Sequence, residues 1–261
     1  MMRKALKKWL YGRCPGLAGA FPYFGVRVYF PPNSLSFYAA CDQGIFERSN
    51  VITLQQLARP STTVFDIGAN IGLMAIPVLE SCRTCRVVSV EPSPNVVSFL
   101  RRTIASSGFG SRWSLIEKAV GARIGRSDFA VSPRTESLFD GLRATRRASS
   151  SKTVEVEITT VDSIWNELGR PPVSIVKCDV EGGELDVFAG ASECLETTKA
   201  AILTEWNGAN LVAYERKQEE LLEFAGRHGY RLFAVPGFAP ITDELTLSLH
   251  MIETESFLLL K

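Results

Sequence analysis

Four apolar segments of this 261-residue chain each end in an acidic residue: Asp66, Glu91, Asp179 and Glu205. A single acid in such a place is often only the cap of a following helix. If the four segments are parallel strands of one sheet, however, their carboxyl ends meet at the edge where open α/β sheets bind ligands. The sequence therefore predicts a ligand site around these four carboxylates.

The turn after Asp66 runs from Gly68 to Gly72 in the stretch "VFDIGANIG". It lacks the middle and final glycine spacing of G-x-G-x-x-G, which a dinucleotide site needs because its backbone must approach a pyrophosphate. An acid followed by two glycines better suits a cationic ligand without phosphate, such as S-adenosylmethionine. Asp66 is then free to meet the ammonium group, and Glu91 is placed to accept the two ribose hydroxyls.

The elements that must position these residues alternate between strand and helix from Thr63 onward. The predicted strands are 63–67, 85–91, 113–120, 127–131, 153–161, 173–179, 200–205, 230–235 and 256–261, and the main predicted helices are 72–80, 92–108, 184–196 and 211–229. The strict alternation in 153–161 indicates a half-exposed antiparallel strand. We therefore expect a doubly wound, mostly parallel α/β sheet with helices on both faces over residues 61–261, and a small N-terminal extension, residues 1–60, packed on it as a cap.

The formal charge of +1 predicts no nucleic-acid partner. The start "MMRKALKKWLYGR" is basic, and Leu6, Trp9 and Leu10 would share one face of a helix there. Two alternatives stay open for this segment: weak peripheral binding to an anionic membrane, or a frayed and solvated helix. The apolar runs are too interrupted to predict a signal peptide or a transmembrane span.

The six cysteines lie in apolar surroundings, and they do not form the dense framework of a small secreted domain. Cys82 and Cys85 make a C-x-x-C, but a zinc site needs a second pair, and His228 and His250 are far apart. We therefore expect reduced thiols and a cytoplasmic protein.

Several motifs resemble the FkbM-type methyltransferases. They are "FDIGANIG" (65–72), "VEPSP" (90–94), "VDSI" (161–164) and "KCDVEGGE" (177–184), with Phe188 and Gly190 continuing the last motif and "GIFE" (44–47) upstream. The resemblance covers about residues 30–233, and the ordered combination with K-x-D-x-E-G-x-E is more specific than a glycine turn.

This resemblance implies a class I methyltransferase (Rossmann-like) fold, S-adenosylmethionine as cofactor, and O-methylation of a hydroxyl on a sugar, glycan or secondary metabolite. It also implies the roles of particular residues. Those matched to cofactor binding are Asp66, Gly68, Ala69, Asn70, Gly72, Glu91 and Pro92. Those matched to the catalytic motif, beside the transferable methyl group, are Lys177, Asp179 and Glu181.

The chemistry of the catalytic motif suits methyl transfer to oxygen. A carboxylate such as Asp179 can take the hydroxyl proton, and Lys177 can lower the cost of the developing oxyanion. Taken singly, Lys177 could simply pair with Asp179, and Glu181 could cap the next helix. A Mg²⁺ site from Asp179, Glu181 and Glu205 is the less favoured alternative, and we expect no metal.

The basic segment 143–152, "RATRRASSSK", is expected to be a mobile surface loop. Alternatively, Arg143, Arg146 and Arg147 would close over a phosphorylated acceptor, because guanidinium groups match phosphate oxygens. Two other functions compete with methyl transfer: a nucleotide-cofactor oxidoreductase, and a non-catalytic module that binds the cofactor. Acceptor choice should depend on the N-terminal cap, this loop and residues 236–254.

Overall fold

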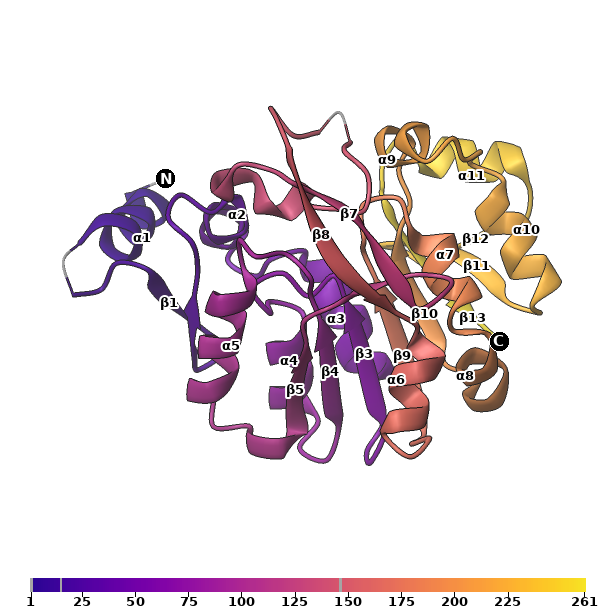
Figure 1. Cartoon of the computed structure of the whole chain (residues 1–261), viewed down its shortest axis with the longest axis horizontal. Coiled ribbons are helices and arrows are strands. Elements are labelled where there is room, and N and C mark those ends of the chain that lie inside the picture. The colour runs from indigo at the N-terminus through magenta and orange to yellow at the C-terminus, as the bar shows by residue number, and fades with distance from the viewer. Residues whose placement is uncertain (1, 15, 146) are drawn as a thin grey trace.

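The computed structural model of the chain describes residues 2–14, 16–145 and 147–261. Its main sheet has the strand order β12-β11-β13-β10-β9-β3-β4-β5 (Figure 1). The bounds are β3 (Thr63–Ile67), β4 (Arg86–Val90), β5 (Trp113–Ile116), β9 (Val173–Cys178), β10 (Ala201–Glu205), β11 (Arg231–Val235), β12 (Ala239–Ile241) and β13 (Ser256–Leu260). The strands from β10 to β5 are parallel, whereas β13 runs antiparallel to β10 and β11. The predicted doubly wound, mostly parallel sheet is confirmed.

Helices cover both faces of this sheet because alternate strand residues point to opposite sides. Phe65 and Ile67 of β3 pack into one apolar cluster, and Val64 packs into the other. The first cluster is completed by α6 (Val161–Glu167), α7 (Glu184–Ala189), α8 (Ser192–Thr198), α9 (Gly208–Ala213), α10 (Glu220–Arg227) and α11 (Glu244–His250). The second is completed by α2 (Leu35–Gln43), α3 (Arg48–Leu57), α4 (Ala75–Ser81) and α5 (Val97–Ser106).

The N-terminal region packs on the second face. It consists of α1 (Met2–Arg13), the hairpin of β1 (Ala20–Tyr23) and β2 (Val26–Tyr29), and then α2 and α3. Its buried aromatic residues Phe21, Phe30 and Phe37 belong to the same cluster as Val64. In Figure 1, α1 lies at the left end of the molecule, opposite α10 and α11.

A smaller sheet joins β6 (Ala119–Val120), β8 (Lys152–Thr159) and β7 (Gly125–Val131). β7 and β8 pair antiparallel, and β8 alternates between exposed and half-buried residues, as predicted for 153–161. The segment between them contains the short 3-10 helix η2 (Arg134–Phe139), and a second 3-10 turn, η1 (Gly110–Arg112), precedes β5. The predicted strand 113–120 is wrong in extent, because β5 ends at Ile116 and Ala119 already belongs to the smaller sheet.

Two predicted helices are each broken into two. The helix predicted over 184–196 stops at Gly190, where a Cβ atom would lie 2.2 Å from the carbonyl oxygen of Gly121. The helix predicted over 211–229 is interrupted between α9 and α10, where Glu215 has a left-handed φ of 54°. There Arg216 forms ion pairs with Asp186 at 3.0 Å and with Glu220 at 3.0 Å.

The expectation of reduced thiols is wrong for one pair, because Cys82 and Cys85 form a disulfide in the turn between α4 and β4. The tight turn brings their Cα atoms to 5.4 Å, within the range that a disulfide spans. Cys14, Cys41, Cys178 and Cys194 are free. Among the helices of the described residues, none combines the length and the apolar character needed to cross a membrane.

Candidate active site

The carboxyl ends of β3, β4, β9 and β10 surround a cavity of about 250 Å³. The structure brings most of the predicted residues to its lining: Gly68, Ala69, Asn70, Glu91, Pro92, Lys177, Asp179, Glu181 and Glu205. Asp66 and Gly72 do not line it. The sheet edge chosen from the sequence is therefore where the cavity lies.

The glycine turn is shaped by its close approach to the end of β9. Gly68 has a φ of 74°, and a Cβ atom on it would lie 1.7 Å from the carbonyl oxygen of Asp179. Asn70 is also left-handed, and its Oδ1 accepts hydrogen bonds from Ser36 Oγ at 2.9 Å and from the Ile71 N–H at 3.0 Å. Gly72 packs beneath the turn, where a Cβ atom would meet the Trp113 ring at 2.8 Å. The turn is thus fixed before any ligand binds.

Glu91 is held at the end of β4 by two backbone donors. Its carboxylate accepts from the N–H of Asn70 at 2.8 Å and from the N–H of Ser93 at 2.8 Å. Burial raises the pKa of Glu91 to about 7, although these hydrogen bonds act in the opposite direction. A carboxylate fixed in this way can accept hydrogen bonds from a ligand in the cavity.

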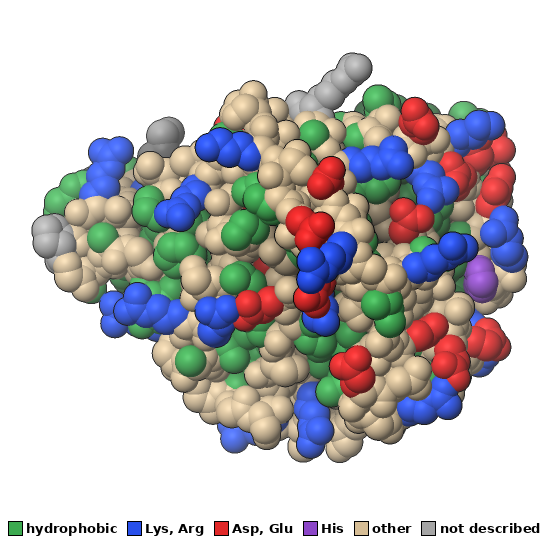
Figure 2. Space-filling view, in the orientation of Figure 1, with side chains coloured by type: hydrophobic (Ala, Val, Ile, Leu, Met, Phe, Trp, Pro, Cys, Tyr) green, Lys and Arg blue, Asp and Glu red, His purple; other side chains and the backbone are tan. Residues whose placement is uncertain are grey.

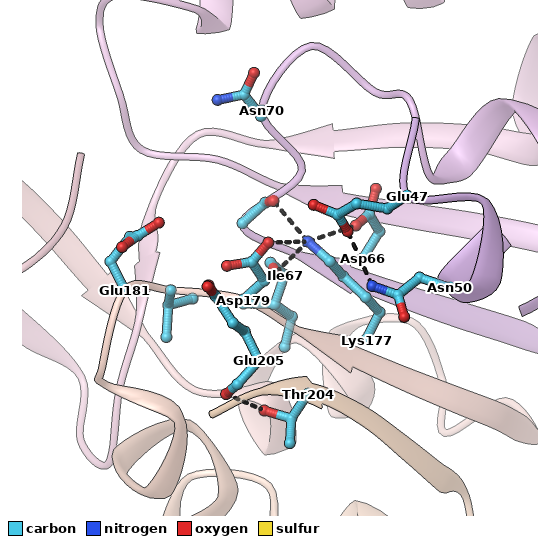
Figure 3. A network of polar contacts seen from close by, with 12 residues as sticks. Glu47, Asn50, Asp66, Ile67, Asn70, Lys177, Asp179, Glu181, Thr204 and Glu205 are labelled. Carbon is cyan, nitrogen blue, oxygen red and sulfur yellow. Dashed lines mark hydrogen bonds and ion pairs between the residues drawn. The ribbon is translucent and has the colours of Figure 1, made fainter. Parts of the chain in front are cut away.

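Lys177 lies at the centre of a network of polar contacts (Figure 3). Because Lys177 and Asp66 are register partners on β9 and β3, Lys177 Nζ lies 3.5 Å from Asp66 Oδ1, and it also lies 3.5 Å from Asp179 Oδ2. The ammonium donates to the carbonyl oxygens of Gly68 at 2.8 Å and Ile67 at 3.3 Å. Burial alone would lower the pKa of Lys177, but the carboxylates of Asp179 and Asp66 outweigh it and raise the pKa. Lys177 is therefore charged.

This network corrects one expectation about Asp66. From the sequence we expected Asp66 to bind a ligand ammonium. In the structure Asp66 is only 2% exposed, and its carboxylate pairs with Lys177 instead. Its Oδ2 also accepts from Ser89 Oγ at 3.4 Å. Asp66 thus acts behind the cavity, where it holds the lysine in place.

Asp179 differs from Asp66 because its side chain keeps 31% of its surface open to the cavity. Burial raises the pKa of Asp179 to about 7, against the opposing effect of Lys177 and with a further contribution from Glu205. A carboxyl group with such a pKa is suited to exchange a proton near neutral pH.

Arg147 enters the cavity from the segment between β7 and β8. Its guanidinium lies 3.1 Å from Glu181, 2.8 Å from Glu205 and 3.5 Å from Glu255, and it stacks over the Phe139 ring at 4.9 Å. Burial raises the pKa of both Glu181 and Glu205, and Arg147 opposes that shift. Arg147 is therefore the counter-ion of Glu181, Glu205 and Glu255, which together form the acidic wall of the cavity.

The expectation of a mobile surface loop over 143–152 is wrong at Arg147, which packs into the cavity wall because three carboxylates pair with it. Arg143 lies 5.0 Å from the Tyr214 ring centre and donates to the carbonyl oxygen of Ala213 at 3.2 Å. Arg146 lies outside the described residues. Since Arg147 is already neutralised, the structure gives no support to the alternative that it binds an acceptor phosphate.

Glu47 is a cavity residue that the pattern of acidic strand ends does not reveal. It precedes α3 with a left-handed φ of 43°, and its carboxylate accepts from Asn50 Nδ2 at 2.9 Å. Figure 3 shows it beside Lys177 and Asp66. Glu47 is the last residue of the "GIFE" motif, which is visible in the sequence. No rule of residue spacing, however, predicts that this motif lies beside β3 and β9.

The carboxylates of Asp179, Glu181 and Glu205 converge as a metal site would require, with ligand atoms within 4.8 Å of one another. Oxygen ligands of this kind suit Mg²⁺. The guanidinium of Arg147, however, already supplies positive charge to Glu181 and Glu205. The guanidinium of Arg147 therefore supplies at these carboxylates the positive charge that a metal ion would otherwise provide.

The fold and this cavity define an α/β protein with a polar cavity at the carboxyl edge of a parallel sheet. The chain belongs to the methyltransferase FkbM domain family, whose model matches residues 66–232. Its fold is accordingly the class I methyltransferase fold that the sequence predicted.

Individual proteins similar to this chain are also methyltransferases. The 2-O-methyltransferase NoeI of Sinorhizobium fredii (strain NBRC 101917 / NGR234) is 28% identical over 167 residues, which cover 59% of this chain and 67% of NoeI. The structure of the methyltransferase FkbM from Methylobacillus flagellatus KT aligns with a TM-score of 0.49 at 16% identity, over 87% of this chain and 54% of that one. This chain thus spans about half the length of the Methylobacillus protein. Precorrin-6y C5,15-methyltransferase from Geobacter metallireducens GS-15 aligns with a TM-score of 0.45 at 13% identity, over 81% and 88% of the two chains.

Proposed function

We propose that this protein is an S-adenosylmethionine-dependent O-methyltransferase. The observation that carries the proposal is the pairing of the charged Lys177 with the cavity-facing Asp179, at the sheet edge where Glu91 and the glycine turn also lie. Membership of the FkbM family supports methyl transfer as the reaction. The relation to NoeI supports oxygen as the atom that receives the methyl group.

The charge of the cavity supports the choice of cofactor. Its lining includes the carboxylates of Glu47, Glu91, Asp140, Asp179 and Glu181, which would repel a pyrophosphate but attract a ligand with a sulfonium and an ammonium group. We assign Glu91 to the ribose hydroxyls, and Gly68, Ala69, Asn70 and Pro92 to the walls that surround the cofactor. Asp66 and Gly72 support this wall from behind.

The residues of the chain then perform three tasks in methyl transfer. When bound, the cofactor supplies a methyl group activated by the positive sulfonium. Asp179 would accept the proton of the acceptor hydroxyl, and Lys177 would stabilise the charge on that oxygen while the methyl group leaves the sulfonium, whose sulfur departs as a neutral thioether. The fixed turn and the walls hold the two reactants in line, which supplies much of the rate. Glu181 acts through Arg147, which it orients.

We propose a neutral, hydroxyl-rich acceptor such as a sugar, a glycan or a secondary metabolite. Glu181, Glu205 and Arg147 offer both hydrogen-bond acceptors and donors at the wall beside Asp179, as recognition of several hydroxyls requires. The same acidic wall disfavours a phosphorylated acceptor. The cavity lining also includes residues 137–142 and Glu255.

Calorimetric titration with S-adenosylmethionine and separately with NAD tests the cofactor assignment. We expect binding of S-adenosylmethionine and none of NAD, and binding of NAD alone would contradict the proposal. Transfer of an isotope-labelled methyl group to a panel of neutral glycans then tests the reaction. Cofactor binding without turnover on any hydroxyl-bearing acceptor would instead favour a non-catalytic module.

A further inference from the structure

The outer face of α1 carries exposed apolar side chains. Leu6 is 56% exposed and Trp9 is 55% exposed, and Leu17 in the turn that follows is 40% exposed. The inner side of the helix is held, because Tyr11 packs against the second apolar cluster and Lys8 pairs with Asp42 of α2 at 2.6 Å. The helix is therefore anchored on one side and exposes Leu6 and Trp9 on the other.

The same helix is rich in positive charge. The helix carries five basic residues and no acidic one, although the whole chain has a formal charge of only +1. Among the described residues, Lys8 is the member of this set with an ion-pair partner, which leaves Arg3, Lys4, Lys7 and Arg13. In Figure 2 blue and green side chains lie together at the left end, where Figure 1 places α1, and red side chains gather toward the centre and right.

We propose that α1 docks the protein on an anionic lipid surface. Exposed Trp and Leu enter the boundary between headgroups and acyl chains, while Lys and Arg stay among the lipid phosphates. A single amphipathic helix of this length gives weak and reversible binding that depends on anionic lipid. The proposal is independent of the assigned reaction, because none of these side chains lines the cavity.

The position of α1 gives this docking a geometric consequence. α1 contacts α2, and Ser36 of α2 lines the cavity and donates to Asn70 in the glycine turn at 2.9 Å. Docking through Leu6 and Trp9 would therefore place the lipid on the side of α1 away from α2, and α2 would connect the docked helix to the glycine turn.

α11 carries a second exposed apolar face, but the charge around it is opposite to that around α1. Leu245 is 71% exposed and Leu249 is 57% exposed. The exposed residues around them include the acids Asp243, Glu244 and Glu253. An anionic surface repels this face, so it provides a matched control for α1.

Co-sedimentation of the full chain with vesicles tests the proposal. We expect binding to vesicles of phosphatidylcholine and phosphatidylglycerol at roughly 7:3, and at least about tenfold weaker binding to phosphatidylcholine alone. Leu6→Glu with Trp9→Glu should abolish binding, and Lys4→Glu with Lys7→Glu should weaken it about tenfold or more. The control Leu245→Glu with Leu249→Glu should leave it unchanged.

Tryptophan fluorescence gives a readout specific to α1, because Trp113, Trp165 and Trp206 are buried whereas Trp9 is exposed. We expect a blue shift on anionic vesicles and quenching by brominated lipid, and Trp9→Phe should lose this response while it still binds. Unchanged melting temperatures would show that the variants fold. Equal binding to both vesicles, retained binding by the Leu6/Trp9 variant, or tighter binding to duplex nucleic acid than to vesicles would each overturn the proposal.

Discussion

At the scale of single residues, Asp179 carries the sharpest prediction. Asp179→Asn keeps the shape of the side chain but removes the proton acceptor, so methyl transfer should fall by about 10²- to 10⁴-fold. Cofactor affinity should change little, because Asp179 lies on the acceptor side of Lys177 in our assignment. Asp186→Asn, which changes a half-buried acid on α7, is the matched control. Wild-type turnover by Asp179→Asn would remove this residue from the role of base.

The raised pKa of Asp179 also predicts how the rate depends on pH. A base accepts a proton only when it is ionised, and burial moves ionisation of Asp179 to about pH 7. The turnover number should therefore rise with pH through this value and level off above it. Measurement of initial rates from about pH 5.5 to 9 tests this expectation. A flat profile over that range would show that the residue titrates at its ordinary pKa or is not the base.

Glu91 should decide cofactor affinity more than turnover. Glu91→Ala removes a fixed carboxylate that we assign to the ribose hydroxyls, and hydrogen bonds to a charged group contribute about 1.5–3 kcal/mol each. Two such bonds amount to about 3–6 kcal/mol, so we expect the dissociation constant of S-adenosylmethionine to rise roughly 10²- to 10⁴-fold in calorimetry. Glu117→Ala removes an exposed acid that pairs with Arg101 and should leave affinity unchanged. Equal effects of both substitutions would contradict the assignment.

At the scale of elements, the segment between β7 and β8 contributes Arg147 to the acidic wall. Arg147→Ala leaves Glu181 and Glu205 without their counter-ion, and breaking a largely buried pair costs about 2 kcal/mol or more of unfolding free energy. The folded-state pKa values of both acids lie above their ordinary values, so ionisation of these acids lowers the free energy of unfolding as pH rises. Without Arg147 this penalty becomes larger. The loss in stability should therefore be larger at about pH 8 than at about pH 5.5.

Chemical denaturation at these two pH values measures that difference. Arg143→Ala is the control in the same segment, since its guanidinium contacts the Tyr214 ring and one backbone oxygen but pairs with no acid among the described residues. Its cost should be small and independent of pH. A pH-independent cost for Arg147→Ala would mean that Glu181 and Glu205 do not depend on this arginine. Magnesium and EDTA should also leave wild-type turnover unchanged if Arg147 serves as the cation of the wall.

The strands were predictable because a strand buried on both faces is a largely apolar run, and β3, β4, β9 and β10 are largely apolar and buried along almost their whole length. The breaks in the helices were not. Gly190 ends α7 because a distant carbonyl, that of Gly121, leaves no room for a side chain. Arg216 joins Asp186 to Glu220 across the gap between α9 and α10. Both breaks depend on contacts between segments, which helical periodicity does not contain.

At the scale of the whole molecule, the cavity combines residues from separate parts of the chain. Lys177, Asp179 and Glu91 were predictable because strand ends in a parallel sheet must meet at one edge. Three further acids and bases reach the same cavity from other segments: Glu47 just before α3, Arg147 from a loop, and Glu255 just before β13. Their positions follow from packing of the chain, so local spacing gave no way to bring them together.

The N-terminal extension, residues 1–60, contributes to the apolar core of the molecule. Phe21, Val28, Phe30 and Phe37 are buried in the same cluster as Val64. Each buried side chain of this size contributes about 1.5–3 kcal/mol, so together they approach the 5–15 kcal/mol by which a domain is stable. Removal of residues 1–60 should therefore leave a chain that does not fold cooperatively.

Removal of residues 1–13 alone should have a much smaller effect, because α1 contributes chiefly Tyr11 to that cluster. Circular dichroism and thermal unfolding of the two truncated chains measure the contrast. The shorter deletion should also keep cofactor binding, since Glu47 and the glycine turn remain. A cooperatively folded 61–261 fragment that binds S-adenosylmethionine as tightly as the whole chain would show instead that the extension only covers a complete domain.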